Sequence, residues 1–392
     1  MQRECRSRGQ IEKNLRGHWN KMKNISVMIK PVSGLCNMKC DYCFYCDEQE
    51  KRRQKSYGRM SEETLRNVVR KTILHTDGAC FFTFQGGEPS LAGLDFFKKF
   101  VEYVNHYNRK RIPVHYAFQT NGTNMTEKWC EFFGENHFLI GISVDGTEEI
   151  HNRYRKFPSG EATYKKIAEA CEMMDRFGVE YNILTVTHKE VAGNIKKIYA
   201  DYKKKGWDFQ QYIACMDPLY EDKGNYPYSL TSEQYGKFLS ELFESWYADY
   251  KKGQQPYIRQ FENYIGILLG FLPEACEHQG ICGIQYVVEA DGSVYPCDFY
   301  MLDEYSLGNF NVNTIGQMDE KRAELQFRET SQMVSEECRR CDYCFLCRNG
   351  CQRNRVLQAD GTYKNYFCKG YKIFFEKHIN QLRQIADNLK RG

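Results

Sequence analysis

Three cysteines stand close together near the start of the chain, at Cys36, Cys40 and Cys43, with the spacing Cys-x3-Cys-x2-Cys. Three thiolates can hold three irons of a 4Fe-4S cubane, which leaves the fourth iron open to another ligand. A structural zinc site is the alternative, but such sites usually supply four ligands, and the nearest further thiol, Cys46, follows only two residues on. The spacing therefore favours an open iron–sulfur cluster that can bind a substrate or cofactor.

A second group of eight cysteines lies in the last third of the chain. Eight thiols are enough for two cubanes with four ligands each, and they also suit two zinc ribbons. From the spacing alone, the two kinds of metal are nearly equal alternatives. The eight residues are Cys276, Cys282, Cys297, Cys338, Cys341, Cys347, Cys351 and Cys368.

Six short apolar segments alternate with amphipathic stretches of helical period between residues 25 and 216, a pattern typical of parallel βα units. None is followed by a Gly-x-Gly-x-x-Gly turn, so a partial (β/α)6 TIM-type barrel is favoured over a dinucleotide-binding fold. Chemistry gathers at the carboxyl ends of barrel strands, where the polar motifs of this chain are found. The predicted strands are 25–32, 80–84, 114–120, 139–144, 181–186 and 209–214.

Composition excludes several other classes of protein. The 392 residues include 55 Lys and Arg against 51 Asp and Glu, and a net charge of +4 is weak for a nucleic-acid partner. The first 23 residues contain no apolar run of a secretory signal, and no segment reaches membrane-spanning length. We therefore expect a cytoplasmic protein without nucleic-acid or membrane partners, whose eighteen cysteines are reduced or bound to metal.

The first cysteine loop, with the aromatic residues that follow it, resembles the radical S-adenosylmethionine (SAM) superfamily. In that superfamily the open iron chelates SAM, and the reduced cluster releases a 5'-deoxyadenosyl radical. The run 85–89, Gln-Gly-Gly-Glu-Pro, looks like the glycine-rich SAM-binding motif of the superfamily, where backbone without side chains approaches the cofactor. The resemblance implies SAM contacts by Tyr42, Gly87, Ser143, Arg155 and Met216, with a plain surface charge as the alternative for Arg155.

The cysteine-rich region resembles the SPASM extension of radical SAM enzymes. The similarity to the anaerobic sulfatase-maturating enzymes covers nearly the whole chain and is carried by residues 36–45, 84–91, 119–122, 217–220 and 288–300. A radical oxidation needs an electron acceptor, which redox-silent zinc cannot be, so two auxiliary 4Fe-4S clusters are favoured. The resemblance assigns the inner cluster to Cys276, Cys282, Cys297 and Cys351, and the outer one to Cys338, Cys341, Cys347 and Cys368. Cys344 adds a possible alternative ligand to the outer cluster.

The family also places its general base at Asp298, directly after the cluster ligand Cys297; a solvated turn aspartate is the alternative. The implied reaction begins when the radical takes a β-hydrogen from a serine or cysteine of an unfolded sulfatase polypeptide. Asp298 then removes the hydroxyl or thiol proton, and one electron passes to the inner cluster. The product is Cα-formylglycine, and the outer cluster exchanges electrons with a ferredoxin or flavodoxin or passes them back toward the SAM site.

Two other functions are compatible with the same residues. One is a SPASM-type maturase that cross-links a ribosomal peptide, although residues 1–24 are too short for the leader-recognition domain that such enzymes commonly carry. The other is a non-catalytic iron–sulfur module for electron transfer or binding, which needs no open iron.

The expected organisation has five parts. Residues 1–23 form an extension expected to be disordered, 24–235 the radical SAM partial barrel, 236–272 a helical connector, 273–370 the SPASM domain and 371–392 a terminal helix. The helix, from Tyr371 to Leu389, is expected to dock on the body through its apolar residues Ile373, Phe374, Ile379, Leu382, Ile385 and Leu389.

Overall fold

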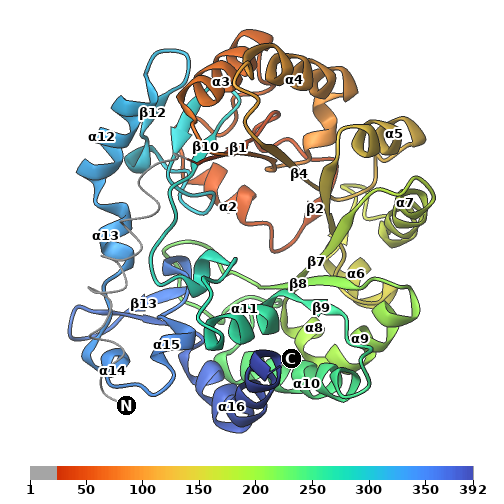
Figure 1. Ribbon diagram of the computed structural model, residues 1–392, viewed down its shortest axis with the longest axis vertical. Helices are drawn as coiled ribbons and strands as arrows, with labels where there is room; N and C mark the ends of the chain where they lie inside the picture. The colour runs from red at the N-terminus through yellow and green to blue at the C-terminus, as the bar shows by residue number, and fades with distance from the viewer. Residues whose placement is uncertain (1–23, 392) are drawn as a thin grey trace.

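A computed structural model describes residues 24–391 of the chain, arranged as a curved sheet with helices around its outer side (Figure 1). The predicted disordered extension, residues 1–23, lies outside the described residues, as does Cys5. Helices α3, α4, α5 and α7 lie along the outer side of the sheet, whereas α2 lies on its inner side. Among the described residues, no helix is long and apolar enough to cross a membrane.

The six predicted strands are confirmed, and they lie next to one another in parallel, in the order β1-β3-β4-β5-β7-β8. The first strand is shorter than predicted and ends before Pro31, which has no backbone N–H to donate to a neighbouring strand. The bounds are β1 (Ile25–Ile29), β3 (Cys80–Phe84), β4 (Val114–Thr120), β5 (Phe138–Ser143), β7 (Tyr181–Thr187) and β8 (Phe209–Ala214).

Helices connect these strands, as the helical periodicity predicts. Phe97 and Phe100 of one helix and Ile167 and Met174 of another are fully or almost fully buried, so each helix covers the sheet with an apolar stripe. The bounds are α3 (Glu62–His75), α4 (Leu94–Tyr107), α5 (Glu127–Glu135), α6 (Glu148–Tyr154), α7 (Tyr164–Arg176), α8 (Lys189–Gly193) and α9 (Ile195–Lys204).

Four further strands extend the sheet to ten, which the sequence did not predict. Strand β9 (Tyr257–Ile258) pairs with β8, while β10 (Tyr286–Val288) pairs in parallel with β1, so that Val27 lies opposite Tyr286. Strands β11 (Ser293–Tyr295) and β12 (Gly308–Asn309) follow as an antiparallel extension. Strand β11 runs back toward the amino end of β1, but Asp298, which follows it, lies within reach of Lys30 after β1 and of Gln85 after β3.

Two long helices pack together below the sheet, α10 (Ser232–Tyr250) and α16 (Cys368–Arg391) (Figure 1). Glycine is required where they meet, since a Cβ on Gly236 would lie 2.7 Å from the Gly370 carbonyl oxygen. The terminal helix begins at Cys368, earlier than predicted. The prediction that Ile373 and Leu389 dock is wrong: they are 36% and 56% exposed, because the stripe that includes Phe374 and Leu382 faces the body instead.

The remaining elements are short and surround the late cysteines. They are α11 (Arg259–Leu268), α12 (Ile315–Leu325), α13 (Phe327–Ser331), α14 (Glu336–Arg339), α15 (Cys344–Cys347) and the hairpin of β13 (Arg355–Leu357) and β14 (Tyr363–Asn365).

Candidate active site

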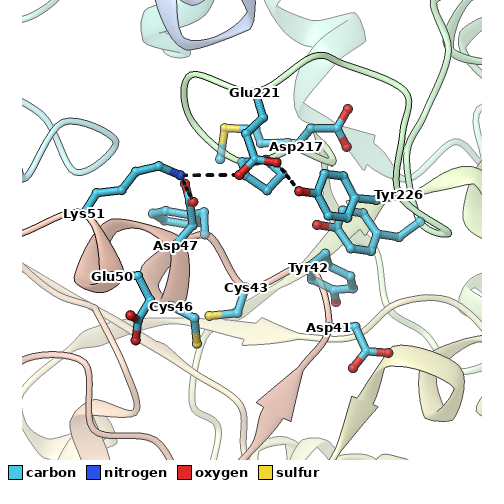
Figure 2. A pocket seen from close by; sticks show the side chains of 14 residues that line it. Asp41, Tyr42, Cys43, Cys46, Asp47, Glu50, Lys51, Asp217, Glu221 and Tyr226 are labelled. Atoms are coloured by element: carbon cyan, nitrogen blue, oxygen red, sulfur yellow. Dashed lines mark hydrogen bonds and ion pairs between the residues drawn. The ribbon is translucent and has the colours of Figure 1, made fainter. Parts of the chain in front are cut away.

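The first cysteine loop is fixed by two short elements. Strand β2 (Lys39–Cys40) pairs antiparallel with β6 (Arg155–Lys156), which sets Cys40 opposite Arg155. Helix α2 (Phe44–Glu50) begins directly after Cys43. A cavity of about 530 Å³ opens beside the loop, and Figure 2 shows Cys43, Cys46 and Tyr42 at its wall; Met216 also lines it.

The ends of β3 and β4 hold the cysteine loop from one side. The buried carboxylate of Glu88 accepts hydrogen bonds from the Asn121 N–H at 2.7 Å and the Thr120 hydroxyl at 2.8 Å. The Glu88 N–H donates to the Leu35 carbonyl at 2.8 Å. Asn121 also donates from Nδ2 to Asn37 Oδ1 at 2.9 Å. The polar strand ends therefore position the loop that carries the first cysteines.

The glycine pair after β3 has a structural cause in this packing. Gly86 and Gly87 have φ of +86° and +52°, a region that side chains disfavour. A Cβ on Gly87 would lie 2.2 Å from the Leu35 carbonyl oxygen, and one on Gly86 would lie 2.2 Å from Cε of Lys30. Packing against the cysteine loop and Lys30 therefore requires glycine at both positions, whether or not the predicted contact of Gly87 with SAM is made.

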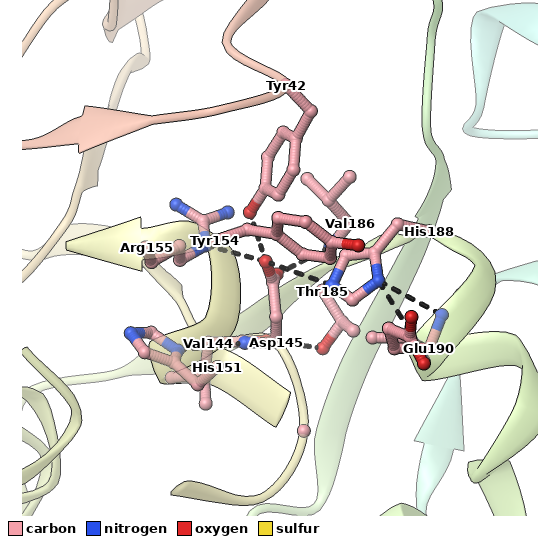
Figure 3. Close-up of polar contacts among 12 residues, drawn as sticks. Tyr42, Val144, Asp145, His151, Tyr154, Arg155, Thr185, Val186, His188 and Glu190 are labelled. Carbon is pink, nitrogen blue, oxygen red and sulfur yellow. Dashed lines mark hydrogen bonds and ion pairs between the residues drawn. The ribbon is translucent and has the colours of Figure 1, made fainter. Parts of the chain in front are cut away.

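Arg155 is buried against a carboxylate, so the interpretation as a surface charge is wrong. Its Nε donates to Oδ2 of Asp145 at 2.8 Å, and the same carboxylate accepts from the Tyr42 hydroxyl and from the Val186 N–H (Figure 3). Burial raises the pKa of Asp145, but the charges of Arg155, His188 and His151 and the Arg155 hydrogen bond together outweigh it, so the net pKa is lowered. Asp145 thus holds Arg155 and Tyr42 together. It lies two residues after Ser143, the last residue of β5.

Of the first three thiols, Cys36 is exposed, and Cys40 and Cys43 are half-buried. Burial raises the pKa of Cys36 to about 11 and that of Cys40 to about 12, and the Arg155 charge lowers the latter in part. The pKa of Cys43 is lowered, first by a hydrogen bond from Cys46. Thiols with raised pKa values ionise when they bind metal, and the nearby guanidinium favours a ligand set of three thiolates. The loop therefore fits an iron–sulfur cluster.

The eight late thiols form two groups. In the first, burial raises the pKa of Cys297, and the charges of Cys351, Cys282 and Cys276 raise it further. In the second, burial and then the charges of Cys368, Cys338 and Cys344 raise the pKa of Cys347. Cys341 lies near Lys372. The structure thus brings the four predicted inner ligands together, and the fifth thiol Cys344 belongs with the outer group.

Within residues 24–391, no three His, Cys, Asp or Glu side chains are arranged as ligands of a single metal ion. In a cubane each thiolate binds a different iron, so the four sulfurs do not converge on one point. The grouping of the late thiols is therefore compatible with clusters and does not resemble a mononuclear zinc site.

Asp298 is 5% exposed, so the alternative of a solvated turn aspartate is wrong. Its Oδ2 accepts a hydrogen bond of 2.6 Å from the Tyr45 hydroxyl and one of 2.9 Å from Gln85 Nε2. Lys30 Nζ lies 3.9 Å from Oδ1. Burial raises the pKa of Asp298, while the Lys30 charge and the Tyr45 hydrogen bond lower it in part. A carboxylate in this environment can take up a proton, as the predicted general base has to.

Three residues around Asp298 were missed by the sequence analysis: Lys30, Tyr45 and Gln85. Lys30 is 2% exposed, and its ammonium lies 4.2 Å from the ring centroid of Tyr45. Lys30 directly follows the apolar strand β1, and a lysine at such a position could have been recognised in the sequence as a candidate site residue. Tyr45 belongs to the cysteine motif and Gln85 to the glycine-rich motif. Neither motif's sequence indicates that the two side chains bind Asp298.

Family models match two parts of the chain: the radical SAM superfamily matches residues 31–201, and an iron–sulfur cluster-binding domain, SPASM, matches residues 281–342. The partial barrel, the open three-cysteine loop and the two further thiol groups define a radical SAM enzyme with auxiliary iron–sulfur sites. The predictions of fold class, SAM and 4Fe-4S cofactors are thereby confirmed.

Similar proteins indicate which radical SAM enzymes this chain resembles. A "Cysteine-type anaerobic sulfatase-maturating enzyme" of Clostridium novyi is 42% identical over 94% of this chain and 99% of its own. A serine-type enzyme of Bacteroides thetaiotaomicron is 31% identical over 90% of this chain and 89% of its own. The solved structure "Native anSMEcpe with bound AdoMet and Cp18Cys peptide" is 43% identical, covers 94% of this chain and 100% of that chain, and has a TM-score of 0.88.

The chain belongs to the anaerobic sulfatase-maturating enzymes. The predicted family and enzyme class are confirmed, and neither a peptide cross-linking maturase nor a non-catalytic module is favoured by these relatives.

Proposed function

We propose that this enzyme oxidises a cysteine of an unfolded sulfatase polypeptide to Cα-formylglycine. The observation that carries the proposal is the place of Asp298, buried next to a predicted cluster ligand and hydrogen-bonded to residues of the cysteine and glycine loops. A cysteine substrate is favoured over serine because the cysteine-type relative is 42% identical and the serine-type one 31%. One solved relative also holds a peptide.

Each predicted cofactor has a set of residues to hold it. Cys36, Cys40 and Cys43 would bind the first cluster, and SAM would contact the residues that surround it: Tyr42, Gly87, Ser143, Arg155 and Met216. In support, Met216 and Tyr42 line the cavity beside Cys43, and Asp145 holds Tyr42 and Arg155. When bound, SAM and the clusters supply a hydrogen-abstracting radical and an acceptor for the second electron.

The chain's own residues handle the proton. Asp298 takes the thiol proton of the substrate cysteine at Oδ2 or Oδ1 while Tyr45 and Gln85 fix the orientation of the carboxylate. Lys30 stabilises the ionised form between turnovers, since its ammonium lies 3.9 Å from Oδ1. The resulting thioaldehyde is hydrolysed to the aldehyde.

The remaining assignments belong to the same proposal. The inner cluster would be held by Cys276, Cys282, Cys297 and Cys351, and the outer one by Cys338, Cys341, Cys347 and Cys368. We keep the division at 24–235, 236–272, 273–370 and 371–392; the family-model matches at 31–201 and 281–342 support its two main domains. A cytoplasmic location and a ferredoxin or flavodoxin as electron donor complete the proposal.

The test is anaerobic. The protein is reconstituted with iron and sulfide and mixed with SAM, dithionite and a peptide carrying a Cys-x-Pro-x-Arg motif, and the peptide is weighed by mass spectrometry. Conversion of the cysteine to an aldehyde together with deoxyadenosine formation supports the proposal. Deoxyadenosine without any change in this peptide or in its serine counterpart would overturn the substrate assignment.

A further inference from the structure

Arg355, the first residue of strand β13, is half-buried and has no part in the reaction described above. Its Nε and Nη2 donate hydrogen bonds of 3.0 Å to the carbonyl oxygens of Asn349 and Gly350. Its Nη1 donates to the Ser331 carbonyl at 2.8 Å. Among residues 24–391 the guanidinium thus binds backbone carbonyls and no carboxylate, so its positive charge is held in place without being neutralised.

Two of these carbonyls belong to the short loop between Cys347 and Cys351. The first of these cysteines is assigned to the outer cluster and the second to the inner one, so the loop joins the two proposed sites. Residues 348–350 have φ values of +48°, +63° and +55°, a region that side chains disfavour. Such a backbone persists only where its surroundings hold it. The hydrogen bonds from Arg355 stabilise this loop and bring the guanidinium to it.

The third carbonyl leads to another proposed ligand of the inner cluster. The hydroxyl of Ser331 accepts a hydrogen bond of 2.8 Å from the Cys282 N–H. Arg355 is therefore bound to segments that hold cysteines of both groups. The electrostatics agree, since burial lowers the pKa of Arg355 and the charges of Cys351 and Cys282 raise it in part. A guanidinium keeps its proton in proteins, so the charge is permanent.

A permanent positive charge beside an iron–sulfur cluster raises its reduction potential, because the cation stabilises the negative charge that reduction adds. We propose that Arg355 is a positioning residue for electron transfer: its charge raises the reduction potentials of both auxiliary clusters, and its hydrogen bonds fix the loop between them. The inference rests on the proposed function, in which the substrate radical loses one electron and the inner cluster gains it. The outer cluster then takes that electron, and Arg355 exchanges neither a proton nor an electron.

The experiment is an anaerobic redox titration of the reconstituted enzyme, followed by electron paramagnetic resonance without peptide. In Arg355→Gln the equilibrium constant for one-electron reduction of the auxiliary clusters should fall about tenfold, a shift of about 59 mV to lower potential. Arg355→Lys keeps the charge and should recover most of this shift. The first cluster, identified by the change of its signal when SAM is added, should keep its potential. Arg176→Gln, at an exposed position of α7, is the matched control and should change no potential.

A second pair of variants neutralises the charge without removing the arginine. Met333 is 64% exposed, and its carbonyl oxygen lies 3.5 Å from Nη1 of Arg355, so Met333→Glu brings a carboxylate close to the guanidinium. Met333→Glu should lower the auxiliary potentials, whereas Met333→Gln should leave them unchanged. This pair takes the place of Arg355→Gln if that variant binds less iron than the wild type.

Unchanged auxiliary potentials in Arg355→Gln with full iron content would overturn the inference, as would equal shifts in Arg355→Gln and Arg355→Lys. If Arg355→Gln loses iron, equal potentials in Met333→Glu and Met333→Gln overturn it. The titration needs no turnover, so an enzyme that makes no aldehyde refutes the proposed function and still gives a result for Arg355.

Discussion

The Tyr45 hydroxyl donates a 2.6 Å hydrogen bond to Oδ2 of Asp298, and this bond joins two distant parts of the chain. Tyr45 lies two residues after Cys43, and Asp298 lies one residue after Cys297. The orientation of the carboxylate is therefore set from both sides by loops that carry predicted cluster ligands. Such fixed geometry is what a general base needs, because small displacements lower the rate of proton transfer.

Asp298→Asn should lower aldehyde formation by about a hundredfold or more, because the amide cannot accept the substrate proton. Deoxyadenosine should still form in the first turnover, since the SAM site is intact. Mass spectrometry of the peptide and chromatography of deoxyadenosine measure the two yields. Asp303→Asn, at an exposed position, is the control, and a variant Asp298→Asn with normal aldehyde yield would remove this residue from the mechanism.

Tyr45→Phe should shift the rising limb of the pH–rate profile to higher pH. The hydroxyl lowers the pKa of Asp298, so its loss raises that pKa, and the base is ionised only at higher pH. The expected shift is about one pH unit, since a hydrogen bond to a charged group contributes about 1.5 kcal/mol. Tyr103→Phe, whose hydroxyl bonds the exposed Glu62, should leave the profile unchanged.

Gly87→Ala should disrupt the glycine loop and weaken SAM binding. The new Cβ would meet the Leu35 carbonyl at 2.2 Å, so the cysteine loop has to move. Gly58→Ala is a matched control, because Gly58 also has a positive φ, +71°, but open space around it, and it should cost only about 1 kcal/mol. Equal SAM affinity and equal iron content in both variants would contradict the packing argument.

Asp145→Asn should weaken SAM binding about tenfold or more. The change leaves the buried guanidinium of Arg155 without its carboxylate, and an unpaired buried charge costs about 3 kcal/mol or more. Isothermal titration with SAM and thermal unfolding measure the two effects. The neighbouring pair of Arg153 and Glu190 is partly exposed, so Glu190→Gln should change unfolding little. A normal melting temperature in Asp145→Asn would mean that Arg155 finds another partner.

Glu48 should make the folded protein less stable as pH rises between about 4.5 and 8. Its pKa is about 8 in the folded state and near 4.5 when unfolded, so the folded state binds more protons in this window. Each unit of difference corresponds to about 1.4 kcal/mol of unfolding free energy. Denaturant unfolding from pH 5 to 8 should show a smaller decrease for Glu48→Gln than for the wild type. If the unfolding free energies of the wild type and Glu48→Gln change equally with pH, the pKa of Glu48 is not raised in the folded state.

Local patterns predicted much of this protein. The spacing of Cys36, Cys40 and Cys43 indicated an open cluster because the ligands of one site are consecutive in one loop. The six strands were recognisable since each is a short run rich in β-branched or aromatic residues between amphipathic stretches of helical period. Asp298 was identified through the resemblance to the family, which places its general base directly after the cluster ligand Cys297.

Long-range contacts explain what the sequence did not predict. Lys30 and Glu48 are charged residues whose buried surroundings come from segments around residues 298 and 353. Strand β10 pairs with β1 through only three residues, too few for a period to be recognised. The spacing of Ile373 and Leu389 fits a helical apolar stripe. However, the close approach of Gly370 to α10 decides which face of α16 packs against the body.

The parallel pairing of Val27 with Tyr286 also governs the order in which the protein can be built on the ribosome. Strand β1 is among the first segments to emerge, yet one of its two edges has no partner until almost three quarters of the chain has been synthesised. An apolar strand with an open edge attracts other strands and is prone to association. Nascent chains that stop before residue 286 should therefore depend on chaperones, and the barrel can close its first edge only after the cysteine-rich region has begun to appear.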